Sequence, residues 1–105
     1  MQVRIAAAAE RDLDEIVARL REESGAAAAL RVEDRLFERC ATLEAFPRRG
    51  NFPPELDAMG RREWREIHEP PCRIVYRVAD EIVTIALVAD ARRDVRALLA
   101  ERLLR

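Results

Sequence analysis

The sequence predicts a single α+β domain in which an antiparallel helical hairpin packs on an antiparallel sheet of about four strands. Two amphipathic helical patterns follow one another in the first half of the chain. Three strand-like runs follow one another between residues 61 and 94 with very little connecting chain, and a short strand and a short helix flank the whole arrangement. Because 105 residues suffice for one hydrophobic core but not for two, we expect one domain over residues 1–105.

The first half contains the first strand and the two helices. Residues 2–6 alternate apolar and polar side chains, which is the period of a short half-buried strand. Residues 8–23 carry apolar side chains every three or four positions and predict an amphipathic helix that stops near Gly25. A second helix is predicted over residues 26–45.

One aliphatic and one aromatic side chain extend the apolar stripe of that second helix. Leu30 and Phe37 lie beside the main stripe and are expected to widen it. Pro47 ends the helix, because the residue before a proline is pushed out of helical geometry. The helices are therefore expected to form a hairpin across one face of the sheet.

The second half begins with a loop over residues 47–60 and continues with the strands. In the strand over residues 62–69, Trp64 and Ile67 fall on opposite faces, which requires a bulge or burial of both faces. Residues 72–79 alternate and present one apolar face to the helices.

The last strand and helix follow a tight turn at Asp80 and Glu81. Residues 82–89 are apolar on both faces, as expected of a central strand. A short C-terminal helix follows over residues 95–103, with Asp94 as its N-cap.

The composition excludes several classes of function. The formal net charge of −1 at pH 7 gives no electrostatic footprint for nucleic acid, so a polyanion contact requires a local cluster. All nineteen basic residues are arginine, which excludes lysine chemistry. The excess of arginine reflects either a GC-rich genome or planar, bidentate recognition of phosphate or carboxylate.

Two cysteines and one histidine cannot form a four-ligand zinc site without carboxylates. Cys40, Cys72 and His68 match no metal-ligand spacing, so we expect neither a metal nor another cofactor. No signal peptide or membrane-spanning stretch is apparent. We therefore expect a cytoplasmic protein with no membrane partner and with reduced thiols.

Four arginines are candidates for an anion-binding cluster. Arg73 and Arg77 project from the same face of one strand, and Arg92 and Arg93 follow the end of its neighbour. These groups are in a position to converge. Such a cluster either pairs with nearby acidic side chains or binds an acidic ligand, and the sequence leaves both readings open.

His68, Glu66 and Cys72 are further candidates. Histidine is suited to general acid–base catalysis near neutral pH, and Glu66 is expected on the same face of the strand as His68. The two form either a proton-transfer pair or an ordinary salt bridge. Cys72 is either an activated thiol or, because it lies on the apolar face, a buried and inert one.

Beyond these patterns, the chain resembles the RelE/ParE superfamily of bacterial type II toxins, often described as plasmid stabilization proteins. The resemblance covers essentially the whole chain, and its strongest parts are residues 46–50, 54–56, 65–67, 73–78 and 90–94. Members have the order of elements derived above. They are neutralised by a cognate antitoxin that wraps the toxin with a helix and an extended segment.

The resemblance implies one of two activities. RelE-like members are ribosome-dependent endonucleases that cleave mRNA, whereas ParE-like members are not nucleases and poison DNA gyrase. Arg73 and Arg93 match the two arginines that RelE-like enzymes place around the phosphate. However, Trp64 and Glu66 stand where those enzymes carry a lysine pair, and the C-terminal helix has no tyrosine.

The sequence thus favours a ParE-like toxin without catalytic activity, whose partners are an antitoxin and DNA gyrase. Arg73, Arg77, Arg92 and Arg93 are its expected antitoxin- or target-binding residues. The alternative is a RelE-like enzyme that acts on the ribosome and mRNA. Its catalytic residues would be Arg73, Arg93, His68 and Glu66.

Overall fold

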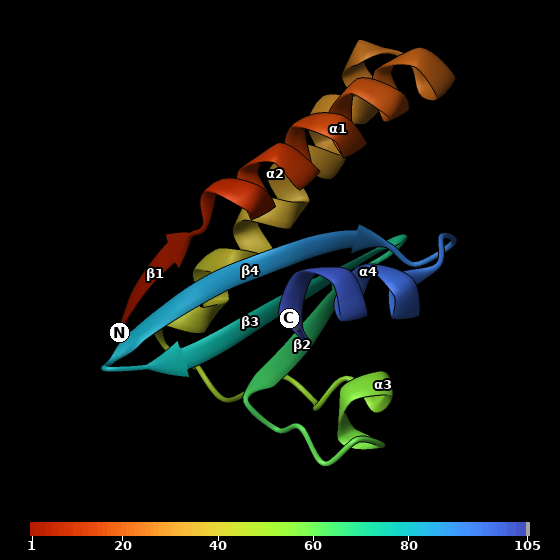
Figure 1. Ribbon diagram of the computed structural model, residues 1–105. Coiled ribbons are helices and arrows are strands. Elements are labelled where there is room, and N and C mark those ends of the chain that lie inside the picture. The colour runs from red at the N-terminus through yellow and green to blue at the C-terminus, as the bar shows by residue number, and fades with distance from the viewer. Residues whose placement is uncertain (105) are drawn as a thin grey trace.

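The computed structural model describes residues 1–104 and confirms the predicted α+β fold (Figure 1). In chain order the elements are β1 (Gln2–Ile5), α1 (Ala7–Ser24), α2 (Ala26–Ala41), the 3-10 turn η1 (Thr42–Glu44), α3 (Pro54–Asp57), β2 (Trp64–Glu69), β3 (Cys72–Ala79), β4 (Ile82–Asp90) and α4 (Val95–Leu103). The short helix α3 lies within the predicted loop. The second helical segment reaches Glu44 only by way of the 3-10 turn.

The four strands form one sheet in the order β1-β4-β3-β2. Strands β2, β3 and β4 are antiparallel as predicted, whereas β1 pairs parallel to β4, with Gln2 opposite Ile82. The sheet is therefore mixed. Parallel neighbours need a long crossover, and the helical hairpin with the chain that follows it supplies one.

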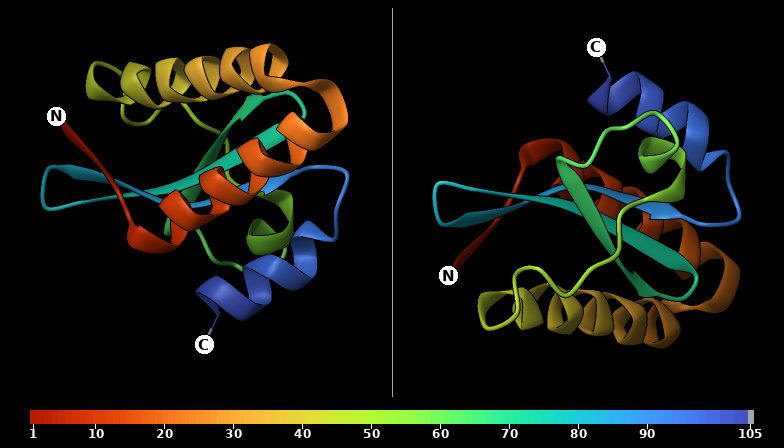
Figure 2. Two further views of the ribbon diagram at one scale, coloured as in Figure 1. Left: turned by 90° about the horizontal axis from the view of Figure 1, so that it is seen from above. Right: turned by 90° about the horizontal axis from the view of Figure 1, so that it is seen from below.

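The α1–α2 hairpin covers one face of the sheet (Figure 2). Ile16 and Leu36 of the helices pack with Ile74, Tyr76 and Ile85 of the strands in one buried cluster. The predicted apolar face of β3 thus meets the helices as expected. Burial of these side chains contributes about 1.5–3 kcal/mol for each large residue.

The far end of the hairpin extends beyond the sheet (Figure 1). Leu30 and Phe37 are 57 % and 46 % exposed, so the expectation that they widen the buried stripe was wrong. They are seven residues apart and lie on one side of α2. That side has no layer of the described chain packed on it.

The opposite face of the sheet is covered in part by α3 and α4. Leu56 of α3 and Leu99 of α4 pack there against Trp64, Val75 and Leu87 of the strands. Strand β4 is buried on both faces, which confirms its central character.

The opposing faces of Trp64 and Ile67 have a simple explanation. Strand β2 pairs with β3 in continuous register, and the irregularity of the sheet lies in the pairing of β3 with β4, between Val75 and Tyr76. Trp64 belongs to the cluster beneath α3 and α4, whereas Ile67 belongs to the cluster beneath the hairpin. Burial of both faces, and not a bulge in β2, therefore accounts for the pattern.

The loop before α3 is fastened to the sheet at Gly50. The Gly50 N–H donates to the Tyr76 hydroxyl at 2.9 Å, and Asn51 forms an isolated bridge with Glu66. A Cβ atom on residue 50 would lie 2.5 Å from the Glu66 carbonyl oxygen, so only glycine fits at this position. This anchor brings Asn51 and the start of α3 next to β2 and β3.

Candidate functional site

Arg73 is the centre of an ion-pair network formed by three elements. Its Nε donates to Glu66 Oε1 of β2 at 2.6 Å, and its two terminal nitrogens donate to the two oxygens of Glu55 of α3 at 2.7 and 2.8 Å. The hydrogen bonds that Arg73 donates to Glu55 lower the pKa of that carboxyl group, and its bonds to Glu55 and Glu66 raise the pKa of Arg73 itself. Of the two readings left open by the sequence, internal pairing therefore holds for Arg73.

Glu66 is buried, with 2 % of its surface exposed. Its second oxygen accepts from Asn51 Nδ2 at 3.0 Å. The His68 Nε2 atom lies 3.5 Å from Glu66 Oε1, which is longer than a well-formed hydrogen bond. The predicted neighbourhood of Glu66 and His68 is thus confirmed, but both oxygens of Glu66 are already used by other donors.

The remaining arginines of the predicted cluster lie apart from Arg73. Arg92 pairs with Asp90 at 2.6 Å, and this hydrogen bond lowers the pKa of Asp90. Arg77 lies opposite Thr84 of β4 and Trp64 of β2, toward the other end of β3. Arg73 and Arg77 do not meet, because side chains four residues apart on a strand are separated by about 13 Å.

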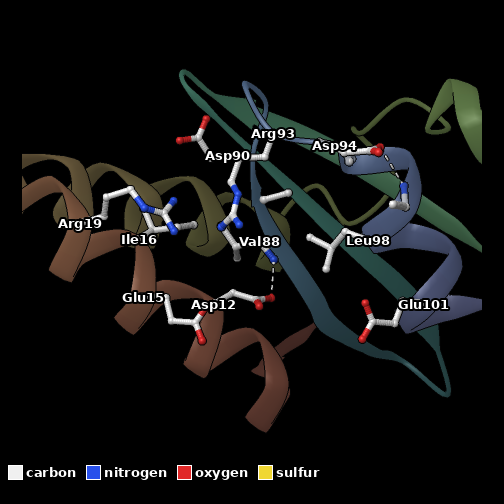
Figure 3. Close-up of a pocket in the computed structure, with 13 residues that line it drawn as sticks. Asp12, Glu15, Ile16, Arg19, Val88, Asp90, Arg93, Asp94, Leu98 and Glu101 are labelled. Carbon is white, nitrogen blue, oxygen red and sulfur yellow. Dashed lines mark hydrogen bonds between the residues drawn. The ribbon is translucent and has the colours of Figure 1, made fainter.

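Arg93 lines a pocket between α1, the end of β4, and α4 (Figure 3). The pocket has a volume of about 340 Å³. Within residues 1–104 neither Arg93 nor Arg77 makes an ion pair. These two exposed guanidinium groups therefore remain available to an acidic partner.

Asp12, which lines this pocket, belongs to an ion pair that the sequence patterns did not predict. Asp12 of α1 accepts two hydrogen bonds from Arg102 of α4, at 2.9 and 3.1 Å. The two residues are ninety positions apart in the chain. Nothing in the spacing of charged residues on either helix indicates the pairing.

Both cysteines are buried and free, as predicted for an inert Cys72. Burial raises the pKa of the Cys40 and Cys72 thiols to about 11.

In the described part of the chain, no group of three or more His, Cys, Asp or Glu side chains is placed to hold a metal ion. No helix over residues 1–104 has the length and apolar character needed to span a membrane.

Comparison with known proteins first establishes the class of fold. A chain from a structure described as the chromosomal ParDE TA system from P. aeruginosa superposes with a TM-score of 0.72, at 20 % sequence identity, over 86 % of this chain and 95 % of that chain. This likeness shows a shared fold with a protein of a toxin–antitoxin system. A search among curated proteins gave no match.

The sequence itself then identifies the family. Residues 3–95 match the family described as ParE toxin of the type II toxin-antitoxin system, parDE. The match covers most of the chain, so the chain belongs to the ParE toxin family. The resemblance to type II toxins, on its ParE-like side, is thereby confirmed.

Proposed function

We propose that this protein is a toxin that binds and poisons DNA gyrase, that it does so without catalysis of its own, and that a cognate antitoxin neutralises it. The observation that carries the proposal is that the Arg73 guanidinium group forms ion pairs with both Glu55 and Glu66. This arginine is one of the two that resemble the phosphate-binding groups of RelE-like nucleases. Membership of the ParE toxin family supports the same choice.

Charge explains why the network disfavours phosphate chemistry. Arg73 carries one positive charge, and the two carboxylates of Glu55 and Glu66 carry two negative charges when ionised. A scissile phosphate brought to this point would meet a net negative site, whereas phosphoryl transfer requires groups that stabilise developing negative charge. The short contacts of Glu55, 2.7 and 2.8 Å, would also have to open first.

The Arg73 network supports general acid–base catalysis no better than it supports phosphate binding. A general base must reach the proton that it removes, but Glu66 is buried and holds Arg73 and Asn51. Arg93 belongs to a different pocket, between α1 and α4. The network thus resembles a structural clamp between α3 and the sheet more than a catalytic centre.

A gyrase assay tests the proposal directly. We expect the purified toxin to inhibit supercoiling of plasmid DNA and to stabilise gyrase-dependent DNA breaks. Toxin mixed beforehand with its antitoxin is the matched control and should leave gyrase active. Suppose that induction of the toxin arrests growth. If the purified toxin then leaves supercoiling unimpaired and produces no DNA breaks, gyrase is refuted as the target.

The second candidate is a ribosome-dependent mRNA endonuclease. The placement of Arg73, Glu66 and His68 on one face of β2 and β3 favours it. Primer extension on translated mRNA would then show cuts in the ribosomal A site. Those cuts should disappear in Arg93→Gln, a change of an exposed side chain that leaves the ion-pair network intact.

Neutralisation is tested separately with the product of the adjacent gene. We expect that protein to co-purify with the toxin and to restore growth when both are induced. Exposed Arg77 and Arg93 offer contacts for acidic side chains of the antitoxin. Arg92 offers a third contact if its ion pair with Asp90 is replaced by one with an acidic side chain of the antitoxin. Because gyrase, ribosomes and newly made antitoxin are in the cytoplasm, we place the toxin there.

A further inference from the structure

One side of α2 is apolar and exposed along almost the whole helix. Leu30 and Phe37 are 57 % and 46 % exposed. Ala27 and Ala41 are exposed as well, one turn beyond them at the two ends. Because residues three or four positions apart share a face of a helix, these four side chains form one stripe, the α2 stripe.

The α2 stripe has the spacing of a helix that packs against another helix. With Asp34, which stands between Leu30 and Phe37, its positions follow one another in alternating steps of three and four residues. That repeat is typical of a coiled-coil seam. The core contact of α2 uses other residues, such as Leu36 and Cys40. The stripe is therefore additional to the contact of α2 with the rest of the fold.

The charged side chains beside the α2 stripe are complementary in one orientation of a second α2. Arg31 and Glu38 are exposed on the same side of the stripe, and within residues 1–104 neither forms an ion pair. In an antiparallel pair, a twofold axis near residue 34 sets Arg31 of each copy beside Glu38 of the other. A parallel pair would set Glu33 beside Glu38, and these carboxylates repel each other.

The shape of the molecule agrees with the antiparallel orientation. The end of the hairpin that contains the start of α2 extends beyond the sheet (Figure 1). In an antiparallel pair, the two sheets therefore lie at opposite ends of the paired helices. In a parallel pair they would lie side by side at the same end.

We propose that two copies of this chain associate through their α2 stripes as an antiparallel, twofold-symmetric dimer. Leu30 of each copy packs against Phe37 of the other, and two Arg31–Glu38 ion pairs flank the contact. Asp34 lies nearest the twofold axis, where Arg31 of the other copy offsets its charge. Ala27 and Ala41, which meet at the two ends, let the helices approach closely. The symmetry closes the assembly at two copies.

The size of the contact makes this dimer a reversible one. One helix from each copy buries less than the standard interface, at or below about 1,200 Å², which is the range of transient complexes. We therefore expect dissociation in the micromolar range. The stripe shares no residue with the Arg93 pocket or the Arg73 network. The proposal goes beyond the choice of gyrase as target and does not depend on it.

Sedimentation velocity of the purified toxin, from about 1 to about 300 µM, measures the association. The wild type should change from monomer to dimer over this series. Phe37→Ser should weaken the dimer about tenfold or more, because both copies lose an apolar contact. The matched control is Phe46→Ser, which removes a phenylalanine that is 67 % exposed and lies outside the stripe. A wild type that stays monomeric throughout, or equal effects of the two changes, would overturn the proposal.

Charge exchange tests the antiparallel orientation. Arg31→Glu and Glu38→Arg should each weaken the dimer, because each places like charges opposite one another twice. An equimolar mixture of the two variants should form a heterodimer in which both ion pairs are restored with their signs reversed. The control mixture combines Arg31→Glu with Glu10→Arg, which alters an exposed charge on α1, and it should show no such gain. Equal association in the two mixtures, with circular dichroism confirming folded variants, would contradict the proposal.

Discussion

Replacing Arg73 with methionine removes the charge that two carboxylates share. Glu66, only 2 % exposed, would lose the guanidinium that pairs with its carboxyl group and keep Asn51 as its remaining close donor. Breaking one partner of a buried pair costs about 3–5 kcal/mol. Because the Arg73 side chain is 14 % exposed and water has some access, we expect the lower end, about 3 kcal/mol.

Urea unfolding measures this loss as a lower midpoint with an unchanged slope. In a domain of this size, 1 kcal/mol corresponds to about 4–8 °C in melting temperature, so a fall of about 12 °C or more is expected. The control is Arg62→Met, which breaks the exposed Arg62–Asp57 pair of similar length and should cost about 1 kcal/mol or less.

The double variant Arg73→Met with Glu66→Gln tests the reason for the loss. It removes both charges, so it should be more stable than Arg73→Met alone. The reasoning is refuted if Arg73→Met costs no more than Arg62→Met. It is equally refuted if the double variant is as unstable as the single one.

Three further predictions concern pH, packing and thiol reactivity. Because the folded-state pKa of Glu55 is lowered from 4.5, its contribution to stability is present above that value and is lost as the pH falls through the folded pKa; Glu55→Gln should lose less stability between neutral and strongly acidic pH when unfolding is followed by circular dichroism. Gly50→Ala should lower the urea midpoint, since its Cβ would lie 2.5 Å from the Glu66 carbonyl oxygen, and an unchanged midpoint would show that the loop moves freely. At pH 8, Cys40 and Cys72 should react with a thiol reagent far more slowly in the folded protein than in urea, because burial raises their pKa to about 11; equal rates would show that the thiols are accessible.

Local patterns predicted the parts of the fold that depend on local chemistry. The Asp94 side chain accepts from the Ala97 N–H at 3.0 Å and caps α4 as expected. The alternation in residues 72–79 correctly predicted which face meets the helices. Periodicity reports the face on which a side chain lies, and that was sufficient for these elements.

Long-range geometry was beyond the reach of those patterns. The direction of β1 depends on the path of a crossover, which no alternation of side chains encodes. The pairing of Glu55 with Arg73 depends on how a loop folds over the sheet, and that of Asp12 with Arg102 depends on the packing of two distant helices. The sequence shows which residues are charged, but it does not show which of them form ion pairs, because those pairs depend on the tertiary structure.

The parallel placement of β1 also affects the time at which a newly made chain matures. Gln2 and Ile82 are opposite one another in the sheet, and Asp12 bonds to Arg102 near the other end of the chain. During synthesis, β1 therefore cannot pair with β4 until β4 has emerged from the ribosome, and the contact between Asp12 and α4 forms later still. Unlike a protein built from neighbouring hairpins, this chain cannot form these two contacts until β4 and α4 have been synthesised, so a translation product truncated before β4 lacks both of them.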